Sequence, residues 1–380
     1  MTKILIPIET SIGERRVSAT PETVKKLKNL GCDVYIEKSA GELSGFKDFS
    51  YEESGGIIFT KQDFNHWKEA DIIFCIHCPD YEKLNKLKEG CLIIGLLNPF
   101  GNKDLAKLLS DLKLSAIALE LLPRISRAQS SDVLSSQANI AGYKSVLLAA
   151  SELDRYFPML MTAAGTVQPA KVVVLGGGVA GLQAVATAKR LGALVFVSDI
   201  RPAVKEQVES LGAKFINLPE IDEKPTESGG YAKAVSTKFL EEQRAILSKH
   251  LSEADVAICT AQVLGKKAPI LINEKMLENM RSGSVVVDLA VAQGGNCVHT
   301  KQNQIVIKNG VKLIGASELP ASVPYHASSL YSKNLISLIT PFINNGILNI
   351  NKNDEIILGC LISDKGAILQ EKVFEIGGSN

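Results

Sequence analysis

Three glycines near the middle of the chain have the spacing G-x-G-x-x-G, within the run KVVVLGGGVAG. Gly176 would permit a tight turn, Gly178 would let the backbone approach a pyrophosphate, and Gly181 would let a helix pack closely on a strand. The apolar residues before the turn predict that strand, and the pattern over 179–191 predicts the helix, whose N-terminus attracts phosphate. The alternative is a structural glycine turn, but this context favours a dinucleotide site.

An acidic residue stands where such a site would contact the sugar of the nucleotide. Asp199 follows the next short apolar run, 194–197. A carboxylate at this position accepts hydrogen bonds from the adenosine ribose and repels a 2′-phosphate, which favours NAD(H) over NADP(H). Arg201 is close by in the sequence and would weaken this preference.

The composition limits the class of protein. A chain of 380 residues is long enough for two domains, and 46% hydrophobic with 22% charged residues is typical of globular proteins. The net charge of +1 gives no electrostatic footprint for nucleic acid. Seven scattered cysteines favour reduced thiols. No apolar run approaches the roughly 18–20 residues that span a bilayer, so we expect a soluble chain.

Strand and helix patterns alternate along the chain, which predicts parallel sheets with helices on both faces. In the N-terminal portion we expect strands at 3–8, 33–37, 57–59, 71–75, 91–96 and 114–119. In the C-terminal portion we expect strands at 171–175, 194–197, 214–216, 255–260, 284–289, 305–307 and 311–314.

Two long helical patterns could connect these portions. One follows the polar stretch 123–139 and runs to about residue 156, and the other covers 321–342. The predicted fold is therefore α/β, with two Rossmann-like domains that contain parallel sheets, are linked by long helices and leave a cleft between them. We expect an N-terminal domain of residues 1–126 plus 322–380 and a nucleotide-binding domain of residues 127–321.

Four segments lack a regular pattern or suggest a turn. Residues 159–168 are expected to form a loop, and 217–230, rich in Pro, Gly and acids, a long functional or mobile loop. Residues 290–296 form a glycine-bearing loop at the end of a strand, where α/β folds bind ligands. The tail, 355–369, is expected to be a hairpin.

No acid or base catalyst is evident. A simple dehydrogenase needs one beside the reacting carbonyl, commonly a histidine or lysine. None of the five histidines lies in a catalytic sequence context: His66, His77, His250, His299 and His326. The sequence thus predicts a cofactor site without a catalyst for a substrate.

The chain resembles the NAD(H)-binding α subunit (domain I) of proton-translocating nicotinamide nucleotide transhydrogenase, which shares its fold with alanine dehydrogenase. The matching motifs cover essentially the whole chain: RRVSATP at 15–21, ELLPRISRAQ at 120–129, SSQANIAGY at 135–143, MTAAG at 161–165, VAGLQAVATAKRLG at 179–192, KEQVESLG at 205–212, GGYAK at 229–233 and DLAVAQGGN at 288–296.

The resemblance implies roles for individual residues. It places Arg124, Gln129, Asp132 and Ser135 at the nicotinamide and its ribose, as the residues that align the ring for hydride transfer. It also places a tyrosine of a nucleotide-closing loop at Tyr231. The full predicted cofactor-binding set is Gly176, Gly178, Val179, Ala180, Gly181, Asp199, Ile200, Arg201, Gly230, Tyr231, Ala261, Gln262 and Leu264, and no metal site is predicted.

The alternative within this fold is an amino-acid dehydrogenase similar to alanine dehydrogenase. That family is expected to carry a lysine where this chain has His77, a histidine where it has Asn98, and an aspartate where Ala292 precedes Gln-Gly-Gly. Because these groups are replaced, the resemblance favours the transhydrogenase, in which hydride passes directly between two nicotinamides and needs only their alignment. A third hypothesis is a non-catalytic NAD-binding module.

The resemblance also implies partners. NAD(H) would bind this chain, whereas NADP(H) would be carried by a membrane-embedded partner subunit that couples the reaction to proton movement. The chain would form a homodimer and lie on the cytoplasmic face of the inner (plasma) membrane as a peripheral subunit.

Overall fold

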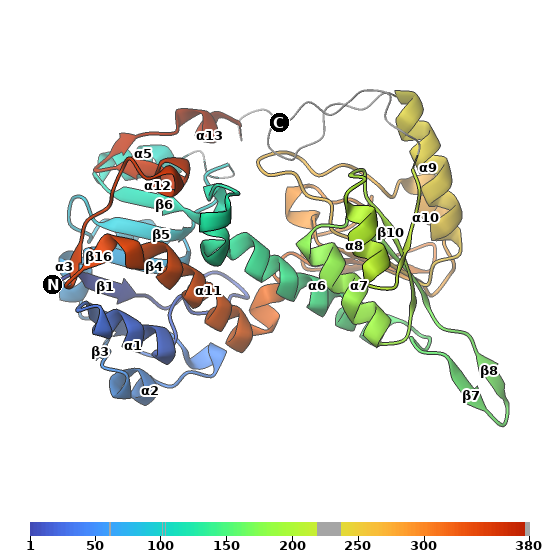
Figure 1. Cartoon of the computed structure of the whole chain (residues 1–380), viewed down its shortest axis with the longest axis horizontal. Coiled ribbons are helices and arrows are strands. Elements are labelled where there is room, and N and C mark those ends of the chain that lie inside the picture. Colours follow the sequence, from blue (N-terminus) through green and yellow to red (C-terminus); the bar gives the residue numbers. More distant parts are fainter. Residues whose placement is uncertain (61, 101, 103, 219–236, 377–380) are drawn as a thin grey trace. The chain divides into compact units, whose positions relative to one another are not determined.

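A computed structural model describes residues 1–60, 62–100, 102, 104–218 and 237–376 (Figure 1). The chain divides into two compact units, one of Met1–Gln137 with Pro320–Asn380 and one of Ala138–Leu319. The predicted boundaries, 126/127 and 321/322, differ from these. Residues 127–137 belong to the first unit because Arg127 pairs with Asp354 at 2.7 Å and the Asn334 amide donates to the Ser130 carbonyl at 2.8 Å.

The first unit is built on an eight-stranded sheet in the order β3-β2-β1-β4-β5-β6-β18-β19. All neighbours from β3 to β6 are parallel, and β18 and β19 form an antiparallel edge. The strands are β1 (Lys3–Ile6), β2 (Asp33–Glu37), β3 (Ile57–Phe59), β4 (Ile72–His77), β5 (Leu92–Leu96), β6 (Ser115–Ala118), β18 (Leu361–Asp364) and β19 (Ala367–Ile368). The strand order reverses between β1 and β4, so this edge is a topological switch point.

Helices cover both faces of this sheet, as β4 illustrates. Its residues Ile72, Phe74 and Ile76 pack into one core, while Ile73 and Cys75 pack into the other. The helices of eight or more residues that lie wholly in this unit are α1 (Pro21–Asn29) and α11 (Pro324–Ile339), both of which have proline in the first turn. Shorter helices are α2 (Asp48–Glu53), α3 (Asn65–Glu69), α4 (Tyr81–Leu84), α5 (Leu105–Asp111), α12 (Glu355–Cys360) and α13 (Glu371–Ile376).

The second unit repeats the same arrangement in a seven-stranded sheet of order β11-β10-β9-β12-β13-β15-β14, in which only β14 is antiparallel. The strands are β9 (Lys171–Leu175), β10 (Leu194–Ser198), β11 (Lys214–Phe215), β12 (Val256–Cys259), β13 (Val285–Asp288), β14 (Ile305–Lys308) and β15 (Val311–Gly315). The helices are α7 (Val179–Arg190), α8 (Val204–Ser210), α9 (Thr237–Ser252) and α10 (Glu274–Glu278), together with α6 (Val133–Glu152), which begins in the first unit. The switch point here lies between β9 and β12.

The predicted fold class is confirmed, since both units are α/β with mostly parallel sheets in the Rossmann strand order. The predicted loop at 159–168 was wrong, because β7 (Leu160–Thr162) and β8 (Gly165–Val167) form an antiparallel hairpin. The first half of the predicted C-terminal hairpin was also wrong. There the Asp354 carboxylate accepts from the Ile356 N–H at 2.9 Å and starts α12, although the isoleucines favour a strand.

Most of the segment 217–230 lies outside the described residues, so the prediction of a functional loop there is not addressed. Across the described stretches of the chain, none of the helices combines the length and apolar character that a bilayer span requires.

Candidate dinucleotide-binding site

The turn after β9 has glycine for two structural reasons. Gly176 has a φ of +106°, and a Cβ atom there would lie 2.6 Å from Thr260 Oγ1. A Cβ on Gly181 would overlap the Gly176 carbonyl oxygen. The backbone conformation therefore requires Gly176, and the close approach of α7 to the turn requires Gly181.

Gly178 has no such reason in the protein itself. Its φ is −75°, which any residue adopts, and a Cβ there would meet no atom within 4 Å. It caps the N-terminus of α7, where Val179 and Ala180 form the first turn and Val179 is largely exposed. Bare backbone beside open space at the positive end of a helix fits a diphosphate that lies against it. The residues here therefore suit the pyrophosphate of a dinucleotide.

Asp199 lies directly after β10 and is already bonded on both oxygens. Its Oδ2 accepts from the Gly177 N–H at 2.7 Å and from Arg201 Nη2 at 2.8 Å. Its Oδ1 accepts from the Arg201 N–H at 2.8 Å and from Arg201 Nε at 2.9 Å. Burial alone would raise the pKa of Asp199, but the bonds from Arg201 and Gly177 lower the pKa by more, so the carboxyl group stays ionised.

The loops after β12 and β13 are joined by buried polar side chains that the sequence did not reveal. The fully buried Asn296 accepts from the Ala261 N–H at 3.0 Å and donates to the Ala261 carbonyl at 2.9 Å. Asp288 accepts from the N–H groups of Ala290, Asn296 and Cys297 at 2.8–3.0 Å. Ala261 thus sits at the switch point with its backbone groups satisfied by Asn296, while the exposed Gln262 donates to the Leu289 carbonyl at 2.6 Å.

The structure gathers many of the predicted cofactor-binding residues in the second unit. The glycine turn, Asp199, Ile200 and Arg201 surround the ends of β9 and β10, and Ala261, Gln262 and Leu264 follow the neighbouring β12. Gly230 and Tyr231 lie outside the described residues.

The four residues predicted at the nicotinamide lie in the first unit, at the start of α6. Arg124 and Gln129 are exposed, and Asp132 and Ser135 are half-buried. Asp132 caps this helix, because its Oδ1 accepts from the Ser135 N–H at 2.9 Å and its Oδ2 from the Ser135 hydroxyl at 2.6 Å. A structural role of Asp132 and Ser135 is therefore visible independently of any ligand.

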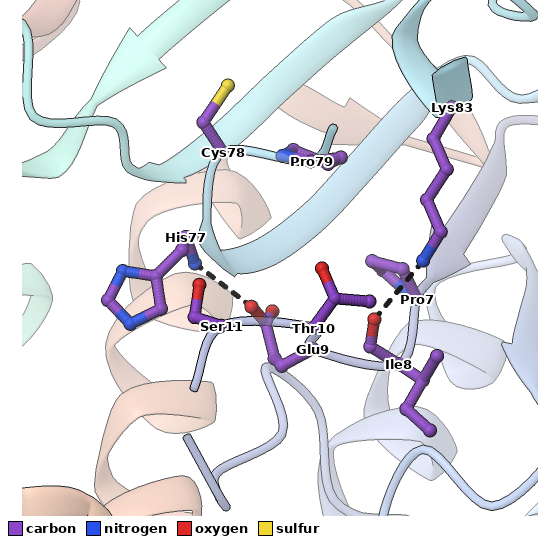
Figure 2. Close-up of a pocket in the computed structure, with 9 residues that line it drawn as sticks. All are labelled: Pro7, Ile8, Glu9, Thr10, Ser11, His77, Cys78, Pro79 and Lys83. Carbon is purple, nitrogen blue, oxygen red and sulfur yellow. Dashed lines mark hydrogen bonds between the residues drawn. The ribbon is translucent and has the colours of Figure 1, made fainter. Parts of the chain in front are cut away.

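The switch point of the first unit holds a cluster of charged groups that sequence analysis missed (Figure 2). Figure 2 shows Glu9 directed at the end of β4, where its carboxylate accepts from the N–H groups of Ile76 at 2.6 Å and His77 at 3.2 Å. These groups fall where the pairing of β4 with β5 is irregular, so Glu9 replaces strand partners. Burial raises the pKa of Glu9 to about 7.

His77 and Arg16 are both occupied by Glu14. The His77 Nε2 lies 2.8 Å from Glu14 Oε2, and Arg16 donates through Nε and Nη2 to the two Glu14 oxygens at 2.8 and 2.6 Å. The Glu14 and Arg16 side chains are 1% and 3% exposed. The adjoining crevice, lined by residues that include Glu9, His77 and Lys83, has a volume of about 10 Å³, which is room for about one water molecule. The signal that sequence reasoning overlooked was the presence of two acids directly after the first strand.

Comparisons with known proteins give consistent results. Family models described as "Alanine dehydrogenase/PNT, N-terminal domain" and "Alanine dehydrogenase/PNT, C-terminal domain" match residues 5–141 and 145–371. The chain is 44% identical over 375 residues to an NAD(P) transhydrogenase subunit alpha protein of Rhodospirillum rubrum, covering 97% of each protein.

Two solved structures extend this similarity. A transhydrogenase from Sinorhizobium meliloti superposes with a TM-score of 0.87 and 40% identity, covering 96% of this chain and 99% of that one. An L-alanine dehydrogenase gives a TM-score of 0.82 and 26% identity, covering 99% of each chain.

Proposed function

Because the chain belongs to the alanine dehydrogenase/PNT family, we propose that it is the NAD(H)-binding subunit of a proton-translocating transhydrogenase. The carrying observation is the contrast between an open glycine turn in the second unit and a filled crevice in the first. The turn leaves space for a nucleotide at Gly178, whereas Glu14 occupies the groups His77 and Arg16 that could act on a small substrate.

The departures from alanine dehydrogenase support this choice. His77 stands in the place of the expected lysine and is bonded to Glu14. The Asn98 N–H donates to Glu120 at 2.5 Å, and Ala292, before Gln-Gly-Gly, has no ionisable group. The higher identity to transhydrogenase proteins than to alanine dehydrogenase points the same way.

In this proposal the chain contributes binding and orientation. The N-terminus of α7 holds the diphosphate, and Asp199 holds the adenosine ribose. Arg124, Gln129, Asp132 and Ser135 orient the nicotinamide, and Gly230 and Tyr231 contribute further contacts. When bound, the nicotinamide supplies the hydride. Alignment of two nicotinamides can account for catalysis, since orientation alone contributes roughly 7–11 kcal/mol in well-aligned reactions.

The second nucleotide, NADP(H), is proposed to bind a membrane-embedded partner subunit, where hydride transfer is coupled to proton translocation. The chain would then lie on the cytoplasmic face of the inner membrane as a peripheral subunit. This assignment rests on the transhydrogenase subunit names of its relatives.

A homodimer is proposed because the hairpin of β7 and β8 extends from the second unit (Figure 1). Each strand has three residues, and Met159 and Met161 on this segment are 56% and 74% exposed. An isolated two-stranded hairpin is marginally stable in water, so a second copy of the chain is the expected cover. Met161→Ser should weaken dimerisation in sedimentation experiments, whereas Ile307→Ser, on the exposed strand β14, should not. A monomeric wild-type chain would contradict the dimer.

The main test mixes the purified chain with the NADP(H)-binding partner subunit and follows reduction of an NAD analogue by NADPH. We expect transfer in the mixture and none with either protein alone. NADH-dependent amination of pyruvate by the isolated chain would instead support the amino-acid dehydrogenase. NADH binding without transfer to any partner would support the non-catalytic module.

A further inference from the structure

The carboxylate assigned to the adenosine ribose has no acceptor position left. A carboxylate offers about four acceptor positions, and Asp199 already receives four bonds within 2.9 Å. If the ribose hydroxyls are to donate to Asp199, some of these bonds must break first.

The four bonds are not equally replaceable. Two come from the backbone N–H groups of Gly177 and Arg201 and are fixed by the turns that contain them. The other two come from the Arg201 guanidinium, with Nε on one oxygen and Nη2 on the other. Two neighbouring hydroxyls of a ribose can donate in the same pattern, one to each oxygen. The guanidinium therefore occupies the positions that the sugar would use.

The Arg201 side chain is also the partner that is free to move. It is 50% exposed, whereas the Asp199 side chain is 6% exposed. A buried carboxylate needs a counter-charge, and Arg201 supplies it in this structure. A guanidinium released beside the sugar would be close enough to pair with a 2′-phosphate, which it binds with a bidentate geometry.

We propose that Arg201 determines nucleotide selectivity by competing with the adenosine ribose for Asp199. Binding of NAD(H) breaks the two guanidinium bonds, which weakens NAD(H) affinity, and the released guanidinium lessens the repulsion between Asp199 and a 2′-phosphate. The inference deepens the proposed function and rests on NAD(H) binding at this turn.

The test compares NADH and NADPH binding by the full chain, using the fluorescence of the reduced nicotinamide that both nucleotides share. In Arg201→Met we expect the dissociation constant for NADH to fall about 3- to 10-fold and that for NADPH to rise about 10-fold, as expected when one charge-assisted contact is lost. Arg201→Lys, which keeps a charge but not the fork, should be intermediate and also serves if the methionine variant does not fold.

Two controls separate this inference from simpler explanations. Arg190→Met removes an exposed arginine at the other end of α7 and should leave both affinities unchanged. Asp199→Asn should lower the preference for NADH over NADPH, because the neutral amide no longer repels the phosphate.

Three results would overturn the inference. Equal weakening of both nucleotides in Arg201→Met would mean that the guanidinium binds a shared group such as the diphosphate. An unchanged preference in Arg201→Met or in Asp199→Asn would mean that this pair does not distinguish the sugars. Failure of the wild-type chain to bind NADH would overturn the proposed function as well, whereas NADH binding with an unchanged preference overturns only this inference.

Discussion

The two units share a strand order but use their switch points differently. In both, the strand order reverses beside the first strand, between β1 and β4 and between β9 and β12. The turn after β9 consists of glycines and leaves open space at Gly178. The corresponding region after β1 carries Glu9, Glu14 and Arg16, which bond to one another, to β4 and to His77. Topology alone creates a possible site, and the residues after the strand decide whether it stays open.

The contrast is also electrostatic. At the second switch point the pKa of Asp199 is below its ordinary value, so this carboxylate is charged at neutral pH. At the first switch point burial raises the pKa of Glu9 to about 7, and Glu14 raises the pKa of His77 despite the opposing effect of burial. The first unit should therefore respond to pH in the neutral range, whereas nucleotide binding in the second should not.

The largest expected effect comes from opening the first switch point. Glu14→Ala removes the carboxylate partner of the buried Arg16 and of His77. Breaking a buried pair in this way costs about 3–5 kcal/mol, so urea unfolding should show a loss of that size. Glu22→Gln, which removes an exposed acid paired with Lys26 and Lys333, should cost less than about 1 kcal/mol. Similar losses in both variants would contradict the view that Glu14 organises a buried cluster.

A matched pair of glycine variants should separate stability from binding in the second unit. Gly181→Ala forces its Cβ into the Gly176 carbonyl and should destabilise the chain by about 1–3 kcal/mol. Gly178→Ala meets no protein atom, so its stability should change by less than about 1 kcal/mol, while NADH affinity falls at least about 10-fold. Urea unfolding and NADH titration measure the two quantities. Unchanged NADH affinity in Gly178→Ala would argue against a diphosphate at this backbone.

The smallest expected effect is a pH dependence of stability in the first unit. The folded-state pKa of His77 lies above its ordinary value of 6.5 because the bond to Glu14 outweighs burial. The stabilising contribution of His77 is therefore complete below about pH 6.5 and is lost as the pH rises through the folded-state pKa. The difference in unfolding free energy between wild type and His77→Asn should shrink from pH 5 to pH 9. A constant difference, or one that grows with pH, would contradict the proposed charge on His77.

The second unit could be anticipated from sequence because its key residues are local. Gly176, Gly178, Gly181 and Asp199 lie within one strand–turn–helix–strand segment, so their spacing predicts their geometry. The Asp199–Arg201 fork was not predicted, since the spacing of two residues does not reveal that all four acceptor positions are filled.

The first-unit cluster could not be anticipated in the same way. Glu9 bonds to residues of β4, and Arg16 reaches Gln137 at 2.9 Å, more than a hundred residues away in the sequence. Such contacts depend on strand order and on an irregularity in strand pairing. The hairpin at Leu160–Thr162 and Gly165–Val167 was missed for another reason, because three-residue strands are too short to show a period.

The central claim is that the chain aligns NAD(H) for direct hydride transfer and provides no acid or base for the reaction. The most direct measurement uses NADPH that carries deuterium at the transferred position, bound to the partner subunit, with an NAD analogue on this chain in ordinary water. The account predicts that the reduced analogue retains the deuterium completely. Loss of the deuterium to water would show that a protein group or solvent participates in the transfer and would contradict the account.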